Sequence, residues 1–139
     1  MSRLTESELT ENLDYRGRLV EATQNSGCYA LEVTTPDDAD EIRKRWTDHW
    51  DAEPENSEPE RLAQATNVAY VGAAHSSIYS RLCDHVAGDV RKAGFLSLFP
   101  PERVASIHPD ADPETDEYRC AKELACYGWT TYHDGVLLG

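Results

Sequence analysis

Four side chains in two short segments of the sequence could act together on an anionic substrate. Tyr29 follows Gly27-Cys28 at the start of a β-rich run, and Tyr70 opens a second Tyr-Val-Gly run. Arg81 and His85 come next, four residues apart, so they share one face of a helix. A guanidinium matches the paired oxygens of a phosphate, and imidazole and phenol groups transfer protons. The combination predicts a site for an anionic substrate.

Two strands and one helix must position these groups. We expect a first strand over residues 28–34 and a second that ends at Gly72. Ser76 and Ser77 are suitable helix N-caps. After them, apolar residues recur at helical spacing and give the predicted helix a buried face. These residues are Ile78, Leu82 and Val86.

The two segments together resemble the GIY-YIG nuclease family. The run 27–29 corresponds to the first family motif with Cys in place of Ile, and the run 70–72 corresponds to the second with Val in place of Ile. Arg81 falls at the position of the family's catalytic arginine, and His85 matches the histidine of its Arg-Leu-x-x-His pattern. The resemblance implies that Tyr29, assisted by Tyr70 or His85, activates a water molecule. It implies that Arg81 stabilises charge on the phosphate.

The same resemblance implies a divalent metal ion, Mg²⁺ or Mn²⁺, held by a glutamate in a later helix. We expect that helix to begin at Pro113, because proline is favoured at the first helical position. Glu123, flanked by small and apolar residues, is the preferred ligand. Glu117 is the alternative, since a first-turn carboxylate is also explained by the helix dipole.

The sequence departs from the family pattern at three places. A long segment separates Tyr29 from Tyr70, and we interpret residues 36–65 as an acidic helical insertion between the two tyrosine strands. Ala73 stands where some members carry a lysine. Asparagine is absent from the C-terminal part of the sequence, where the family has one, and we expect His133 or Asp134 to lie in that region.

The composition is strongly acidic for a protein that is expected to bind DNA. Thirteen basic residues face 26 acidic ones, for a formal charge of −13, and only Lys44, Lys92 and Lys122 are lysines. Three Trp and seven Tyr argue against a disordered acidic chain. We therefore expect a globular, halophilic protein, a divergent haloarchaeal or halovirus-like member of the family. Multimolar salt shortens the Debye length to roughly 3 Å or less and screens repulsion from phosphates.

The sequence also predicts where the protein works. Four cysteines show no zinc-site spacing, and no signal peptide or long apolar run is present. We expect a cytoplasmic protein that does not enter the membrane. Its oligomeric state and its DNA sequence or structure specificity stay open.

Further elements follow from local patterns. Residues 1–20 are expected to form an N-terminal arm with a short helix over 4–15. Thr35-Pro36-Asp37-Asp38 predicts a helix start. Residues 94–101 are interpreted as a third strand that ends at two prolines. Gly128 is expected to end the last helix, and residues 129–138 to return as a strand.

The sequence thus predicts a single α+β domain over residues 1–139, with a short central antiparallel sheet flanked by helices. The predicted function is metal-dependent endonuclease activity on DNA. The alternative is a non-catalytic module on the same fold that binds nucleic acid or another protein.

Overall fold

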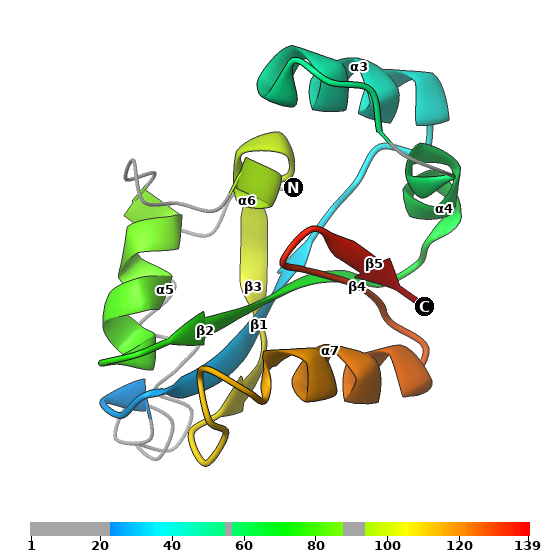
Figure 1. The fold of residues 1–139 in the computed structure, drawn as a ribbon. Coiled ribbons are helices and arrows are strands. Elements are labelled where there is room, and N and C mark those ends of the chain that lie inside the picture. Colours follow the sequence, from blue (N-terminus) through cyan, green and yellow to red (C-terminus); the bar gives the residue numbers. More distant parts are fainter. Residues whose placement is uncertain (1–22, 55–56, 88–93) are drawn as a thin grey trace.

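The two strands that carry the tyrosines pair directly with each other (Figure 1). β1 spans Gly27–Val33 and β2 spans Val68–Ala74, and the two run antiparallel. Their register places Tyr29 opposite Gly72. The predicted first strand is therefore confirmed within one residue at each end.

The computed structural model describes residues 23–54, 57–87 and 94–139, and these residues form a five-stranded sheet in the order β3–β1–β2–β4–β5. The remaining strands are β3 (Pro101–His108), β4 (Thr130–His133) and β5 (Val136–Leu138). The β2–β4 pair is parallel and the other pairs are antiparallel. The sheet is thus mixed, and the prediction of an antiparallel sheet is wrong at this pair. Parallel neighbours need a long crossover, which the chain between β2 and β4 provides.

Helices cover both faces of the sheet (Figure 1). They are α3 (Ala39–Trp50), α4 (Glu58–Gln64), α5 (Ile78–Ala87), α6 (Gly94–Leu98) and α7 (Glu117–Cys126). Both α3 and α4 lie in the segment that connects β1 to β2, so the predicted insertion is helical. Asp38 caps α3 by accepting a hydrogen bond from the Asp40 amide, as its sequence predicts.

Successive side chains of β1 point to opposite faces of the sheet and pack into two separate hydrophobic cores. Tyr29 and Leu31 face a large core that includes residues of α3, α4, α5 and α6. Cys28 and Ala30 face a smaller core that includes Cys120 and Ala121 of α7. Because successive strand residues point to opposite faces, α5 and α7 must lie on opposite sides of the sheet. Tyr29 and helix α5 therefore lie on one side of the sheet. Helix α7, which carries the two candidate glutamates, lies on the other side.

The third-strand prediction is wrong, because residues 94–98 form helix α6. The buried positions Phe95, Leu96, Leu98 and Phe99 follow helical spacing, whereas a strand would bury every second residue. The Phe99 amide donates to the Phe95 carbonyl at 3.0 Å, and their ring centroids lie 5.1 Å apart. The strand β3 starts only at Pro101, where an edge position tolerates a missing N–H group.

The last helix also begins later than predicted. Asp112 and Asp116 bond to nearby backbone amides and hold residues 112–116 in turns, so α7 starts at Glu117 instead of Pro113. Gly128, with φ +98°, follows the helix end as expected. The prediction of one strand over residues 129–138 is wrong, because the chain reverses at Asp134 and Gly135, which both have positive φ, and forms the β4–β5 hairpin. The predicted arm, 1–20, lies outside the described residues.

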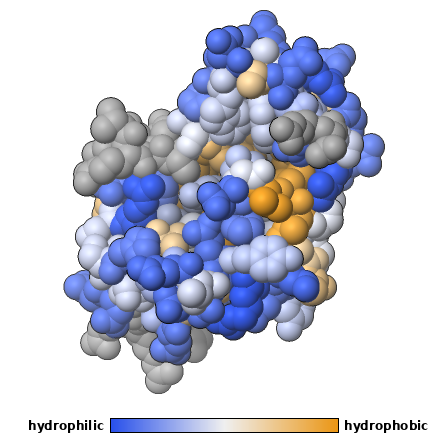
Figure 2. Space-filling view, in the orientation of Figure 1, coloured by the Kyte–Doolittle hydropathy of each residue, from blue (hydrophilic) through white to orange (hydrophobic). Residues whose placement is uncertain are grey.

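The surface is largely hydrophilic on the face shown in Figure 2, in keeping with the acidic composition. An apolar patch on this face lies over the β4–β5 hairpin, where Val136 is 44% exposed. Within the described ranges, none of the helices is long and apolar enough to cross a membrane.

Candidate functional site

The structure brings Tyr29 and His85 into direct contact. The Tyr29 hydroxyl and His85 Nε2 are 2.5 Å apart, and both side chains are fully buried. The two residues come from β1 and α5 and are 56 positions apart in the sequence. Helix α5 is oriented by its cap, in which Ser77 Oγ accepts from the Ser80 amide.

Gly72 makes room for this contact. A Cβ at residue 72 would lie 2.5 Å from the Tyr29 hydroxyl oxygen and 2.9 Å from Cε2 of Tyr70. Any side chain there would displace one tyrosine or both. The glycine of the second motif is thus explained by close approach of side chains across the strand pair.

Tyr70 completes an aromatic group with Tyr29 and His85. Its ring centroid lies 6.5 Å from that of Tyr29 and 5.7 Å from that of His85. Burial raises the pKa of Tyr70 to about 12, and the negative field of Glu117 adds to the rise. Burial also raises the pKa of Tyr29 well above its usual range, with a further contribution from Tyr70. Both phenols are therefore protonated near neutral pH.

Arg81 connects this buried group to the surface. Its positive field, and a hydrogen bond to Tyr29, oppose the rise in the pKa of that tyrosine, but burial is the larger effect. Arg81 alone therefore does not bring the pKa of Tyr29 down to its ordinary value. The guanidinium lies 3.7 Å from the carboxylate of Asp84, one turn along α5.

An open hollow of about 730 Å³ lies beside Arg81. It is formed by the end of β2, the following turn and the first turns of α5, and its lining includes His75, Ser77 and Asp84. Among the four predicted catalytic residues, Arg81 is the one that lines this hollow. An anion in the hollow would meet Arg81 first.

Glu117 and Glu123 have different surroundings on α7. The Glu117 carboxylate accepts a hydrogen bond from His133 Nδ1 at 3.3 Å, and its field reaches Tyr29 and Tyr70. Burial raises the pKa of Glu117, while His133 opposes the rise. The Glu123 side chain is 53% exposed and pairs with Arg119 at 3.3 Å. Glu117 is thus half-buried and paired with His133, whereas Glu123 is exposed on the surface of α7.

His133 pairs with Glu117, a contact that the sequence did not predict. It lies at the end of β4, is 7% exposed, and its Nε2 atom is buried without a hydrogen-bond partner among the described residues. Glu117 and His133 are 16 positions apart, on a helix and a strand. No motif spacing in the sequence marks such a pair.

The donors at Glu117 suit a hard divalent cation. Mg²⁺ is commonly held by one or two carboxylates, with water and phosphate oxygens completing the shell. The half-buried carboxylate of Glu117, with Asp134 nearby, is a site where a cation would offset unfavourable negative charge. Across residues 23–54, 57–87 and 94–139, no three His, Cys, Asp or Glu side chains form a closed metal cage. The ion would therefore depend on water and phosphate oxygens.

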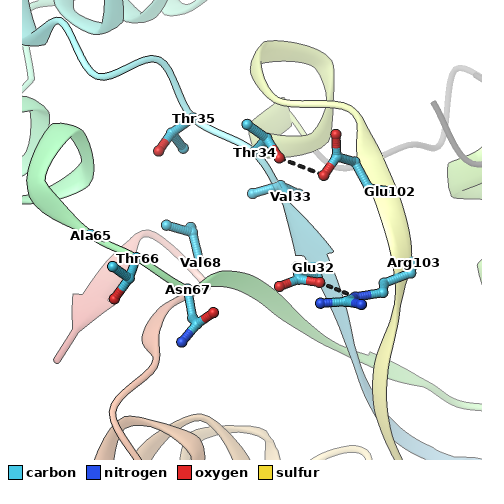
Figure 3. Close-up of a pocket in the computed structure, with 10 residues that line it drawn as sticks. All are labelled: Glu32, Val33, Thr34, Thr35, Ala65, Thr66, Asn67, Val68, Glu102 and Arg103. Atoms are coloured by element: carbon cyan, nitrogen blue, oxygen red, sulfur yellow. Dashed lines mark hydrogen bonds and ion pairs between the residues drawn. The ribbon is translucent and has the colours of Figure 1, made fainter. Parts of the chain in front are cut away.

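A second hollow, of about 520 Å³, lies at the opposite end of β1 (Figure 3). Its charged groups are satisfied by one another: Arg103 pairs with Glu32, and Thr34 donates to Glu102. The Arg103 side chain is 65% exposed. This end of the sheet carries an ion pair between an exposed arginine and a carboxylate that is 13% exposed, whereas both members of the Tyr29–His85 pair are fully buried.

The comparisons with known proteins identify no relative. No family model matches the chain, and neither a curated protein nor a solved structure matches it. The resemblance to GIY-YIG nucleases therefore stays a prediction from the sequence motifs around Tyr29, Tyr70, Arg81 and His85.

Proposed function

We propose that the protein is a metal-dependent endonuclease that hydrolyses DNA phosphodiester bonds, with the active site of a GIY-YIG-like nuclease. One observation carries this proposal. Tyr29, Tyr70, Arg81 and His85 come from three elements and meet beside an open hollow. If Arg81 were only a surface residue and the two tyrosines only packed the core, these side chains would not need to lie together.

Arg81 would bind the scissile phosphate. Its fork of N–H donors matches two phosphate oxygens, and its position at the hollow gives a phosphate access from solvent. Charge that develops on the phosphate in the transition state would be stabilised by a guanidinium already held near Asp84.

Tyr29 and His85 would move the proton. The two atoms share one proton, because either the Tyr29 hydroxyl donates to Nε2 or the protonated Nε2 donates to the hydroxyl. In a relay, the Tyr29 hydroxyl would give its proton to His85 Nε2 while it takes one from the attacking water, so His85 would be the final proton acceptor. Burial holds the pKa of Tyr29 high, so the phenol would stay neutral throughout the relay.

Glu117 would hold the metal ion, and His133 would orient Glu117. A bound Mg²⁺ or Mn²⁺ would neutralise negative charge on the phosphate and its leaving oxygen. The His133 Nδ1 donor restricts the rotation of the Glu117 carboxylate, as outer-shell partners of metal ligands do. Glu117 therefore replaces Glu123 as the proposed ligand.

The acidic surface is compatible with DNA only where salt screens it. At multimolar salt the Debye length is roughly 3 Å or less, so contacts made by Arg81 and a metal ion would dominate over long-range repulsion. We propose accordingly that the enzyme works in a high-salt cytoplasm.

The test is cleavage of supercoiled and branched DNA in multimolar KCl with Mg²⁺ or Mn²⁺. The Arg81→Ala variant should lose cleavage and keep its fold, as measured by circular dichroism. Arg103→Ala is the matched control, because Arg103 is an exposed arginine at the other end of the sheet. Failure of the wild type to cleave at any salt or metal concentration would overturn the proposal. DNA binding without cleavage would instead support a non-catalytic module.

A further inference from the structure

A small aromatic hollow lies away from the candidate active site. Trp46 and Trp50 of α3 and Tyr132 of β4 line a space of about 290 Å³, together with Glu53, Glu58 and Gly135. We refer to these six residues as the aromatic box. In Figure 1 the elements that form it are the C-terminal half of α3, the start of α4 and the β4–β5 hairpin.

The rings of the aromatic box stand at steep angles to one another. The Trp46 centroid is 4.7 Å from that of Trp50, with an interplanar angle of 61°, and 6.2 Å from that of Tyr132, with an angle of 81°. Phe95 stacks on Tyr132 at 4.3 Å and 11°, so one face of Tyr132 is already covered. Ring surfaces of all three aromatic side chains therefore border the same hollow.

The charge around the aromatic box is negative. Glu53 and Glu58 contribute two carboxylates to its lining. The negative field of Glu58 also reaches the Tyr132 hydroxyl, where it adds to the effect of burial in raising the pKa of Tyr132. The field of Glu53 reaches Arg43, but the Arg43 guanidinium is bound to Glu60 at 2.5 Å. Negative ring faces and carboxylates both favour a cation.

We propose that the aromatic box binds a methylated ammonium cation, either a small quaternary ammonium compound or a trimethylated lysine side chain. Such a cation is coated with methyl groups, so it contacts ring faces without the strong hydration that K⁺ or a primary ammonium must lose. The volume of about 290 Å³ is at the lower limit of small-molecule sites, roughly 300 Å³, which favours a compact cation over a nucleotide. This site is independent of the proposed endonuclease activity.

Tetramethylammonium chloride is the first probe, titrated into the full chain at constant chloride in KCl. The indole N–H signals of the three tryptophans report binding by NMR. Signals of Trp46 and Trp50 should shift and saturate, while that of Trp129, outside the aromatic box, should not. A neutral analogue of the same shape tests the charge: choline should bind at least about tenfold more tightly than 3,3-dimethylbutan-1-ol.

Two variants separate loss of the site from loss of the fold. Trp50→Leu removes one wall and should weaken binding roughly tenfold. Glu53→Gln changes only an exposed carboxylate and should weaken binding severalfold with no change in circular dichroism. Glu114→Gln, an exposed carboxylate elsewhere, is the matched control and should bind like the wild type.

Choline and a peptide that contains trimethyllysine distinguish the two sources of the cation. Tighter binding of choline supports a free small molecule, and tighter binding of the peptide over its unmethylated form supports a lysine side chain. The proposal is overturned if no indole signal of Trp46 or Trp50 shifts, or if the neutral analogue binds as tightly as choline.

Discussion

The two ends of the β1–β2 pair carry polar groups of opposite character. At the Tyr29 end, a phenol and an imidazole are fully buried and bonded to each other across two elements. At the Glu32 end, Arg103 and Glu32 pair across neighbouring strands in an open hollow. The first arrangement needs Gly72 and a correctly placed helix, whereas the second needs only adjacent strands.

The difference shows why the first end is the better candidate for chemistry. Exposed ion pairs contribute about 0–1 kcal/mol, because water competes and long side chains must be ordered. Buried polar pairs are costly to break, since each partner then loses its hydrogen bond without gaining water. Substitutions should therefore have large effects at the Tyr29 end and small effects at the Glu32 end.

The largest effect should come from the proposed metal ligand. Glu117→Gln should reduce DNA cleavage about 1,000-fold, because loss of metal binding removes several kcal/mol of charge stabilisation. Glu123→Gln should cleave like the wild type, since its side chain is exposed and paired with Arg119. Single-turnover rates in Mg²⁺ measure the difference, and Mn²⁺ binding followed by electron paramagnetic resonance reports the ligand separately. Equal rates in the two variants would contradict the assignment of Glu117.

The second largest effect should be a loss of stability at alkaline pH, which arises at the Tyr29 end. The pKa of Tyr70 is about 12 in the folded protein and roughly 10 in an unfolded chain, so the unfolded state loses its proton first as pH rises. Stability that is present below pH ~10 should be lost between pH ~10 and 12, by up to ~2.7 kcal/mol for this residue. Urea unfolding at pH 9 and 11 measures the loss.

The Tyr70→Phe variant isolates this contribution, because it should lose less stability between the two pH values than the wild type. Tyr127→Phe is the control, since Tyr127 is 85% exposed. The same pH dependence in all three proteins would mean that Tyr70 is not the source.

Gly72→Ala should cost about 2 kcal/mol of unfolding free energy through steric overlap. The new Cβ would lie 2.5 Å from the Tyr29 hydroxyl oxygen and 2.7 Å from its Cζ. Adding Tyr29→Phe removes the nearest atom, so the double variant should lose less stability than the sum of the two single variants. Denaturant unfolding of all four proteins tests the coupling, and simple additivity would show that the two residues do not clash.

The smallest effect is expected at the Glu32 end. Glu32→Gln and Arg103→Ala should each change the unfolding free energy by less than about 1 kcal/mol and leave DNA cleavage unchanged. Thermal unfolding and cleavage assays at the same salt concentration measure both. A loss of cleavage in either variant would place function at the second hollow and remove the contrast between the two ends.

Local sequence patterns predicted most elements but not their partners. The Asp38 cap and the strands around Tyr29 and Tyr70 follow from residues close in sequence, whereas the hairpin formed by β4 and β5 was predicted as a single strand. The misassigned segment, 94–98, is a short apolar run, and such runs fit a buried strand or a buried helix equally well. Its helical form was decided by the core that Phe95 and Phe99 enter.

The sequence by itself determined the groups available for chemistry: two tyrosines next to glycines, and an arginine and a histidine one helical turn apart. It determined them because motif spacing and helical periodicity are local properties. Only the tertiary structure decided that Tyr29 bonds His85, and that Glu117 pairs with His133 while Glu123 stays exposed beside Arg119. These contacts depend on strand register, on the late start of α7 and on its packing against β4. No spacing along the chain contains that information.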